Sequence, residues 1–264
     1  MWVREFDAAG DTAGFRAAFE QSVKELAYLG YTALENWTFL TKHFTAAEVK
    51  EICARYNTKM VCLYANMDEG IESMKHSVEF IAEMGGQWMI VASPNWPAET
   101  DLDSPMDEDE IRREAVLLNE IGSYAMGFGV TVLHNPHSYT PVSRREESDL
   151  LMQLTDPECV KLCVDAGHSV ISGVDAVELV RDYADRVKYI HIKDIDHNLS
   201  WRGRGQSWVP LGLGTVDLQG FLKTLRDIGY DGVICAGLPV GCEWINRFES
   251  ARIAREYLRI GGGF

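Results

Sequence analysis

Short, continuously apolar runs alternate with longer amphipathic runs along the whole chain, and this alternation limits the folds that the chain can adopt. A run that is apolar at nearly every position is typical of a parallel strand covered on both faces. Eight runs are candidate strands: Trp2–Phe6, Thr32–Asn36, Lys59–Tyr64, Gln87–Ala92, Val130–His134, Lys161–Asp165, Val187–Lys193 and Val233–Ala236.

Between these runs, apolar residues recur at helical spacing. The two clearest stripes are Ile111, Ala115, Leu118, Ile121 and Ala125, and Leu218, Phe221, Leu222, Leu225 and Ile228. Thr45 and Glu48 have the spacing of a capping box, which predicts a helix start. A glycine is expected to end several helices just before the next strand: Gly30, Gly85, Gly127 or Gly129, and Gly229.

Eight strand–helix units in 264 residues average about 33 residues each, which suits a (β/α)₈ barrel of the α/β class. A doubly wound open sheet is the rival fold, but no Gly-rich phosphate loop follows an early strand. No break in composition marks a second domain. We therefore predict one TIM-barrel domain over residues 1–264.

Charge and composition narrow the set of partners. The chain has 40 acidic and 25 basic side chains, a formal charge of −15, which disfavours nucleic acid and anionic membranes as partners. It has neither a membrane-length apolar run nor a signal-peptide-like start, and its six cysteines form no CxxC pair. We expect a soluble, cytoplasmic protein with reduced cysteines and a small-molecule partner. A homo-oligomer or a hetero-complex is compatible with the sequence.

Polar side chains end three consecutive candidate strands. His134, Asp165 and His191 close the fifth, sixth and seventh strands, and such ends converge at the active-site face of a barrel. Two imidazoles and a carboxylate can bind a divalent metal and leave positions open. A single strand-end histidine is more often structural, but His137 and His168 follow closely and favour a metal or catalytic cluster. The long connections 93–107 and 194–217 leave the same face.

Several motifs resemble the xylose isomerase-like TIM-barrel superfamily, which includes sugar isomerases and epimerases, inosose dehydratase, hydroxypyruvate isomerase and endonuclease IV. They are Asp-Ala-Gly-His at 165–168, His-Ile-Lys-Asp at 191–194, Leu-Gly-Leu-Gly-Thr-Val-Asp at 211–217, Gly-Tyr-Asp-Gly at 229–232, and Gly30 to Glu35. The similarity spans nearly the whole chain, and it is specific for the superfamily rather than for a substrate.

The resemblance implies a divalent ion, most often Mn²⁺ and otherwise Co²⁺, Mg²⁺ or Zn²⁺, held by Glu, Asp, His and Glu. Asp165 and His191 match the two middle ligands. The fifth strand has His134 where many members have Glu, and Gly237 stands near the last glutamate. Glu243 follows six residues later, where the sequence alone does not place it.

The missing glutamates favour elimination, because epimerases of this superfamily use both as proton shuttles. The His-rich fifth strand resembles the inosose dehydratase branch, in which proton removal beside a ketone precedes loss of a β-hydroxyl. His137 or His168 is the candidate base, and Lys193 would donate a proton or bind the enolate oxygen. Candidate substrate contacts, each with a packing or surface role as the alternative, are Glu35, Trp37, Tyr64, Trp96, Arg202 and Arg204.

Two other functions stay open. The first is isomerisation or epimerisation of a related sugar through a metal-stabilised enediolate. The second is a degenerate barrel that acts as a sugar-binding or partner subunit, since the last glutamate is absent. A DNA-repair nuclease is disfavoured by the charge of −15.

Overall fold

The computed structural model describes residues 7–95, 106–196, 198, 208–237 and 246–263. Its main sheet is parallel and contains β1 (Ala33–Trp37), β2 (Lys59–Asn66), β3 (Trp88–Ala92), β4 (Thr131–His134), β5 (Val160–Asp165), β6 (Val187–Ile192) and β9 (Val233–Ala236). The longer helices are α2 (Thr12–Tyr28), α3 (Ala46–Arg55), α4 (Ile71–Met84), α5 (Glu108–Met126), α6 (Arg145–Leu154), α9 (Leu218–Asp227) and α10 (Arg247–Tyr257). Two shorter helices are α7 (Ala166–Ile171) and α8 (Ala176–Asp182).

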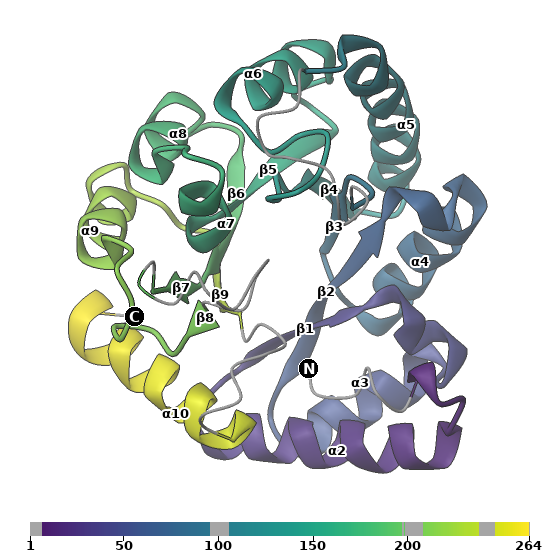
Figure 1. Cartoon of the computed structure of the whole chain (residues 1–264). Helices are drawn as coiled ribbons and strands as arrows, with labels where there is room; N and C mark the ends of the chain where they lie inside the picture. The colour runs from purple at the N-terminus through teal and green to yellow at the C-terminus, as the bar shows by residue number, and fades with distance from the viewer. Residues whose placement is uncertain (1–6, 96–105, 197, 199–207, 238–245, 264) are drawn as a thin grey trace.

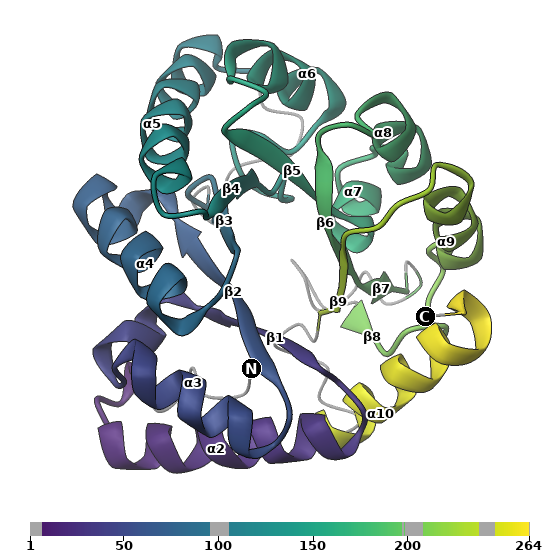
Figure 2. The same cartoon turned by 180° about the vertical axis from the view of Figure 1, so that it is seen from behind.

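The strands lie side by side in the order in which they occur along the chain, β1-β2-β3-β4-β5-β6-β9. A doubly wound sheet would reverse its strand order at a switch point, so this order excludes that rival. Figures 1 and 2 show the strands curving into a ring with the helices outside it, which is a near-closed TIM barrel. The predicted first strand, Trp2–Phe6, lies outside the described residues.

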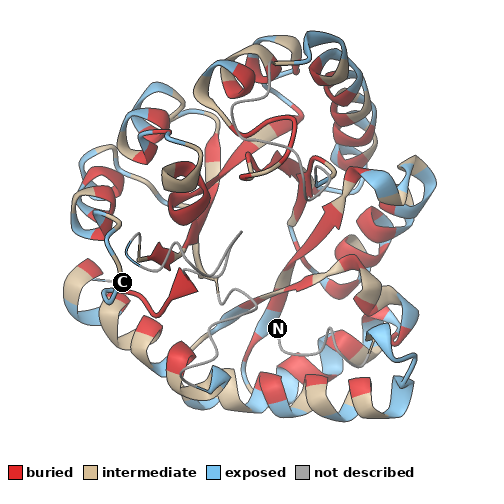
Figure 3. Cartoon of the chain, viewed as in Figure 1, coloured by how far each residue is buried: buried red, intermediate tan, exposed pale blue. Residues whose placement is uncertain are grey.

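Both faces of the sheet are covered, as the apolar runs predicted. One set of side chains packs between the strands and the helices, and a second set fills the barrel interior. The interior set consists of Cys62, Tyr64, Ile90, Ala92, Leu133, Cys163 and Tyr189. Figure 3 shows the buried residues along the strands and the exposed residues on the outer helix faces. Alternate residues of a strand therefore face different apolar environments.

The predicted helix boundaries are confirmed where their local chemistry is strongest. Thr45 and Glu48 form the capping box of α3. Gly85 follows α4 with φ of +82°, in the left-handed region that a glycine adopts without strain. The segment before β1 contacts α10, where the Tyr31 hydroxyl donates a hydrogen bond of 2.9 Å to the backbone carbonyl of Ala251. This contact joins the region before β1 to α10.

The connection after β6 contains a two-stranded antiparallel ribbon that the sequence analysis did not predict. It pairs β7 (Asp194–Ile195) with β8 (Trp208–Val209). The buried Asp194 carboxylate accepts four backbone N–H bonds, from Ile195, Gly212, Gly214 and Val216. The carboxylate thereby fixes the ribbon and the returning chain close to the end of β6. Among the described helices, none has the length and apolarity needed to cross a bilayer.

Candidate active site at the carboxyl ends of the strands

Asp165 ends β5 and caps the helix that follows. Its Oδ1 accepts hydrogen bonds from the backbone N–H groups of Gly167 at 3.0 Å and His168 at 3.1 Å. Its Oδ2 lies 2.5 Å from Lys193 Nζ. Burial acts to raise the pKa of Asp165, but the charges of Lys193 and His191 and these hydrogen bonds outweigh it, so the pKa is lowered. Asp165 is therefore a buried carboxylate with a lysine as its counter-charge.

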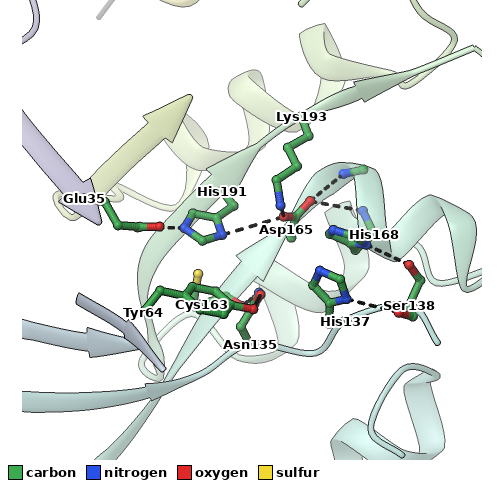
Figure 4. Close-up of polar contacts among 11 residues, drawn as sticks. Glu35, Tyr64, Asn135, His137, Ser138, Cys163, Asp165, His168, His191 and Lys193 are labelled. Atoms are coloured by element: carbon green, nitrogen blue, oxygen red, sulfur yellow. Dashed lines mark hydrogen bonds and ion pairs between the residues drawn. The ribbon is translucent and has the colours of Figure 1, made fainter. Parts of the chain in front are cut away.

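His191 links this pair to the first strand. Its Nε2 lies 2.8 Å from Glu35 Oε2, and its Nδ1 lies 3.7 Å from Asp165 Oδ2 (Figure 4). Nδ1 is buried and has no hydrogen-bond partner among the described residues. Burial acts to raise the pKa of Glu35, but the His191 contact outweighs it and the pKa is lowered. A row of polar groups thus runs from Glu35 through His191 and Asp165 to Lys193.

Two imidazoles contact each other beside this row, with their rings tilted by 35°. The His137 and His168 ring centroids are 3.4 Å apart, and the Ser138 hydroxyl lies 2.7 Å from His168 Nδ1. Burial, followed by the charge of Lys193, lowers the pKa of His137 to about 4. Burial and the neighbouring His137 also lower the pKa of His168. Both rings are therefore neutral near pH 7, the state in which an imidazole can accept a proton.

The tautomer of His137 follows from its contact with the backbone. Its Nδ1 lies 3.1 Å from the Ser138 carbonyl oxygen, which can only accept a hydrogen bond. Nδ1 therefore carries the proton, and the lone pair is on Nε2. His137 is partly exposed whereas His168 is 7% exposed, so His137 is the imidazole that a small molecule reaches more easily.

The aromatic rings of Trp37 and Tyr64 and the amide of Asn135 line the opposite side of the site. The Tyr64 hydroxyl donates a 3.1 Å hydrogen bond to Asn135 Oδ1, and Asn135 Nδ2 donates to the Cys163 carbonyl. The Tyr64 ring lies 6.0 Å from the His191 ring and 4.5 Å from the Trp37 ring. Of the predicted substrate contacts, Glu35, Trp37 and Tyr64 are thus brought together with His191.

The structure does not bring His134 into this cluster. Its Nε2 lies 3.4 Å from Ser93 Oγ, and Ser93 Oγ donates to Glu114 Oε2 of α5 at 2.7 Å. Its neighbour Leu133 belongs to the barrel interior, so the alternation along β4 turns His134 toward the outer helices. The prediction of His134 as a ligand beside Asp165 and His191 is corrected accordingly, since these side chains lie on different faces of the sheet.

The expected four-ligand metal site is not reproduced by the described residues. Asp165 and His191 lie together, but the remaining expected positions carry the outward-facing His134 and the glycine at 237. Lys193 Nζ already binds Asp165 Oδ2. Another group, Glu35, His191 and Cys235, has ligand atoms within 4.8 Å of one another and is a candidate cation site. Burial raises the pKa of the Cys235 thiol.

Three predicted substrate contacts, Trp96, Arg202 and Arg204, lie outside the described residues, as does Glu243, which the sequence alone did not place. Conversely, sequence reasoning missed Asn135, Ser138 and Trp208. The Trp208 ring lies 4.8 Å from the His168 ring, because β8 pairs with β7 and returns over α7. Asn135 and Ser138 flank Pro136 and His137 in the segment that had been singled out for its histidines, and this proximity was the available signal.

Comparisons with known proteins agree with the fold and with the motifs. The family model described as "Xylose isomerase-like TIM barrel" matches residues 23–260. A curated relative named inosose dehydratase, from Geobacillus kaustophilus, is 27% identical over 265 residues, covering 90% of this chain and 86% of the relative.

Two solved structures share the fold at low sequence identity. The IOLI protein with a bound zinc atom superposes with a TM-score of 0.75 at 18% identity, and 93% of this chain and 92% of that one are covered. An L-ribulose 3-epimerase superposes with a TM-score of 0.75 at 17% identity, with 92% and 88% covered. The relatives of this barrel therefore include sugar-modifying enzymes.

Proposed function

The chain belongs to the xylose isomerase-like TIM-barrel family, and from this premise we propose that it is a dehydratase of a keto-sugar or keto-cyclitol. It would remove a proton from the carbon next to the carbonyl and then eliminate a β-hydroxyl as water. The observation that carries this proposal is His137, a partly exposed, neutral imidazole in contact with the His168 ring beside the Lys193–Asp165 ion pair.

His137 is the proposed base for the first step. Its Nδ1 is held by the Ser138 carbonyl, so Nε2 is free to take the proton from carbon. The electrons of the broken C–H bond move to the carbonyl oxygen and form an enolate. Lys193 Nζ lies in the same cluster and would donate a hydrogen bond to that oxygen.

The second step returns the proton. The enolate expels the β-hydroxyl, which takes the abstracted proton from the His137 imidazolium, directly or after its transfer to His168, and leaves as water, so both imidazoles end neutral. His168 is oriented for this role by the Ser138 hydroxyl at 2.7 Å from its Nδ1. Elimination needs a proton removed at one carbon and returned at a neighbouring oxygen, and two imidazoles in contact supply adjacent sites for both transfers.

The substrate class follows from the polar and aromatic residues around this cluster. Glu35 can accept a hydrogen bond from a sugar hydroxyl, and the Trp37 and Tyr64 rings offer faces for the C–H side of a sugar ring. The relative from Geobacillus kaustophilus is named inosose dehydratase, which supports a keto-cyclitol as the first substrate to test.

The predicted cytoplasmic location, oligomeric state and choice of Mn²⁺ stay predictions.

Epimerisation or isomerisation is the second candidate, supported by the fold shared with L-ribulose 3-epimerase. The same enolate would then be reprotonated on carbon instead of losing its hydroxyl. Glu35 and Asp165 lie on either side of His191, and each carboxylate already has a partner, His191 Nε2 for Glu35 and Lys193 Nζ for Asp165. The Ser138 carbonyl engages only Nδ1 of His137, which favours Nε2 of this imidazole as the base and, with it, elimination.

The experiment is an NMR assay in deuterated water on an inosose and a panel of keto-sugars. Loss of water with an enone product is the expected result. Deuterium exchange on carbon without water loss would replace the proposal by epimerisation. Binding without exchange or water loss would favour the degenerate, sugar-binding barrel.

A substitution tests the assigned base directly. His137→Asn should lower kcat by about 10²–10⁴-fold, the usual contribution of a general base. His76→Asn, at an exposed position of α4, is the matched control and should retain activity. An active His137→Asn variant would refute the role of His137 without affecting the assignment of the reaction.

A further inference from the structure

The residues around Lys193 bind its ammonium group and pack against its aliphatic chain. Its side chain is 13% exposed and its Nζ binds the Asp165 carboxylate, whose side chain is fully buried. A buried carboxylate is stable only with a counter-charge or enough hydrogen-bond donors. In this chain, the Lys193 ammonium group supplies the positive charge that balances Asp165. Without the lysine, a bound cation would be needed beside this carboxylate.

Gly237 makes the room for the lysine stem. A Cβ atom added at Gly237 would lie 2.6 Å from Lys193 Cε and 2.8 Å from its Cγ. The Gly237 N–H also donates to the Ile192 carbonyl, which holds the end of β9 against β6. Gly237 stands near an expected ligand position, and the Lys193 side chain fills the space beside it. The two residues therefore depend on each other sterically.

A second glycine and a tryptophan enclose the other side. A Cβ atom at Gly167 would lie 2.5 Å from Trp208 Cζ3 and 3.1 Å from Lys193 Cβ. Lys193 Nζ lies 5.8 Å from the Trp208 ring centroid. Residues from α7, β8 and β9 thus pack around one lysine. Side chains at positions 167 and 237 would take up space that the lysine and the tryptophan use.

We propose that Lys193 is the resident cation of this barrel and takes the place of the divalent ion that the resemblance implies. Its ammonium group neutralises Asp165 and stabilises the enolate oxygen by hydrogen bonding, with no electron transfer and no additional reactant. The catalytic part of this inference rests on the proposed function, whereas the metal-binding part can be tested without it.

The residues themselves argue against a divalent ion in this position. Catalytic zinc sites usually have three protein ligands, and of the expected set only Asp165 and His191 are present among the described residues. The neighbouring carboxylate, Glu35, is already bound to His191 Nε2. A divalent ion between Asp165 and His191 would also face the ammonium group bound to the same aspartate. A single positive charge already balances Asp165, and the neutral imidazoles beside it add no negative charge.

The first experiment measures metal in the full chain after exposure to Mn²⁺, Co²⁺ or Zn²⁺ and removal of free ions. We expect far less than one ion per chain by elemental analysis, no visible absorption from bound Co²⁺, and water-loss activity that resists a chelator. One tightly bound ion per chain, or activity that a chelator abolishes and Mn²⁺ restores, would overturn the inference while leaving the dehydratase proposal intact.

The second experiment removes the charge. Lys193→Met should lower kcat by at least about 10²-fold, as removal of an oxyanion donor usually does. Lys188→Met, on the same strand, is the matched control. The double variant Lys193→Met/Asp165→Asn removes both charges and guards against misfolding of the single variant. Near-normal kcat in a folded Lys193→Met variant would refute the catalytic role.

A third variant tests the exchange of lysine for metal without an activity assay. Lys193→Ala/Gly237→Glu vacates the space of the lysine and returns a carboxylate to the end of β9. We expect this variant to bind Co²⁺ or Mn²⁺ at least about tenfold more tightly than the parent chain, as measured by titration calorimetry. Equal metal affinity of the parent and the double variant would contradict the inference, even if no substrate had been found.

Discussion

Replacing Glu114 with Gln should remove a pH-dependent part of the stability of the barrel. Glu114 is 6% exposed, its Oε2 accepts a 2.7 Å hydrogen bond from Ser93 Oγ, and its Oε1 has no hydrogen-bond partner among the described residues. Burial raises its pKa from 4.5 to about 7, against a smaller lowering by the Ser93 hydrogen bond. The folded protein therefore holds a proton on Glu114 that the unfolded chain releases above its ordinary pKa.

The magnitude follows from the difference between the two values. A pKa raised from 4.5 to about 7 corresponds to about 3 kcal/mol, because each pH unit is worth about 1.4 kcal/mol. This contribution is fully present below pH 4.5 and is lost as the pH rises through about 7. Glutamine is neutral at every pH and keeps an oxygen that can accept from Ser93, so the variant should lack this loss.

The assay is denaturant unfolding of the parent chain and Glu114→Gln at pH 5 and pH 8.5. We expect the free energy of unfolding of the variant, relative to the parent, to rise by about 2.5 kcal/mol between the two pH values, because part of the contribution is already lost at pH 5. Glu108→Gln, at an exposed position on the same helix, is the control and should follow the parent. Parallel pH profiles for the parent and Glu114→Gln would refute the reasoning, because they would mean that the pKa of Glu114 is the same in the folded and the unfolded chain.

Three further predictions concern the stability contributed by other buried positions. Burial lowers the pKa of His134 to about 3, so the contribution of the neutral imidazole to stability is present above pH 6.5 and is lost toward pH 3. The His134→Asn variant should therefore lose less stability than the parent on acidification, as measured by urea unfolding. Asp194→Asn should cost about 2–4 kcal/mol, because an amide NH₂ would face backbone N–H donors; unchanged thermal unfolding would contradict this. Gly167→Ala should cost about 1–3 kcal/mol by displacing Trp208, whereas Gly127→Ala, with a nearest Cβ contact of 3.3 Å, should be milder in the same thermal assay.

The sequence predicted the strands and helices well where local signals were strong. The predicted Val233–Ala236 strand agrees with β9, and the other six described strands are found with shifts of one or two residues at their ends. The apolar runs identified strands covered on both faces, and the glycines and the capping box marked helix ends. The ribbon of β7 and β8 was missed because two-residue strands leave no periodic signal. It forms because the Asp194 carboxylate organises the returning chain, a tertiary contact that spacing does not reveal.

The site was predicted in part, and the misplacement of His134 has a definite physical cause. Asp165 pairs with His191 in register, so these side chains share a face, whereas His134 pairs with Leu162, which packs among the outer residues. A strand with apolar residues on both faces shows no alternation that sets its phase, and an error of one residue moves a side chain to the other face.

The face that each residue at the end of β4 takes also limits which groups can act as the base. Asn135, rather than His134, is the residue from this strand end that reaches Tyr64 and Cys163 inside the barrel. An amide can orient a hydroxyl but cannot accept a proton from carbon near neutral pH. In the proposed mechanism the base comes from the loop that follows, where the Ser138 carbonyl holds His137 with its lone pair on Nε2. With glycine at the end of β9 and an amide after β4, the proposed mechanism relies on imidazoles for proton transfer and on Lys193 for charge.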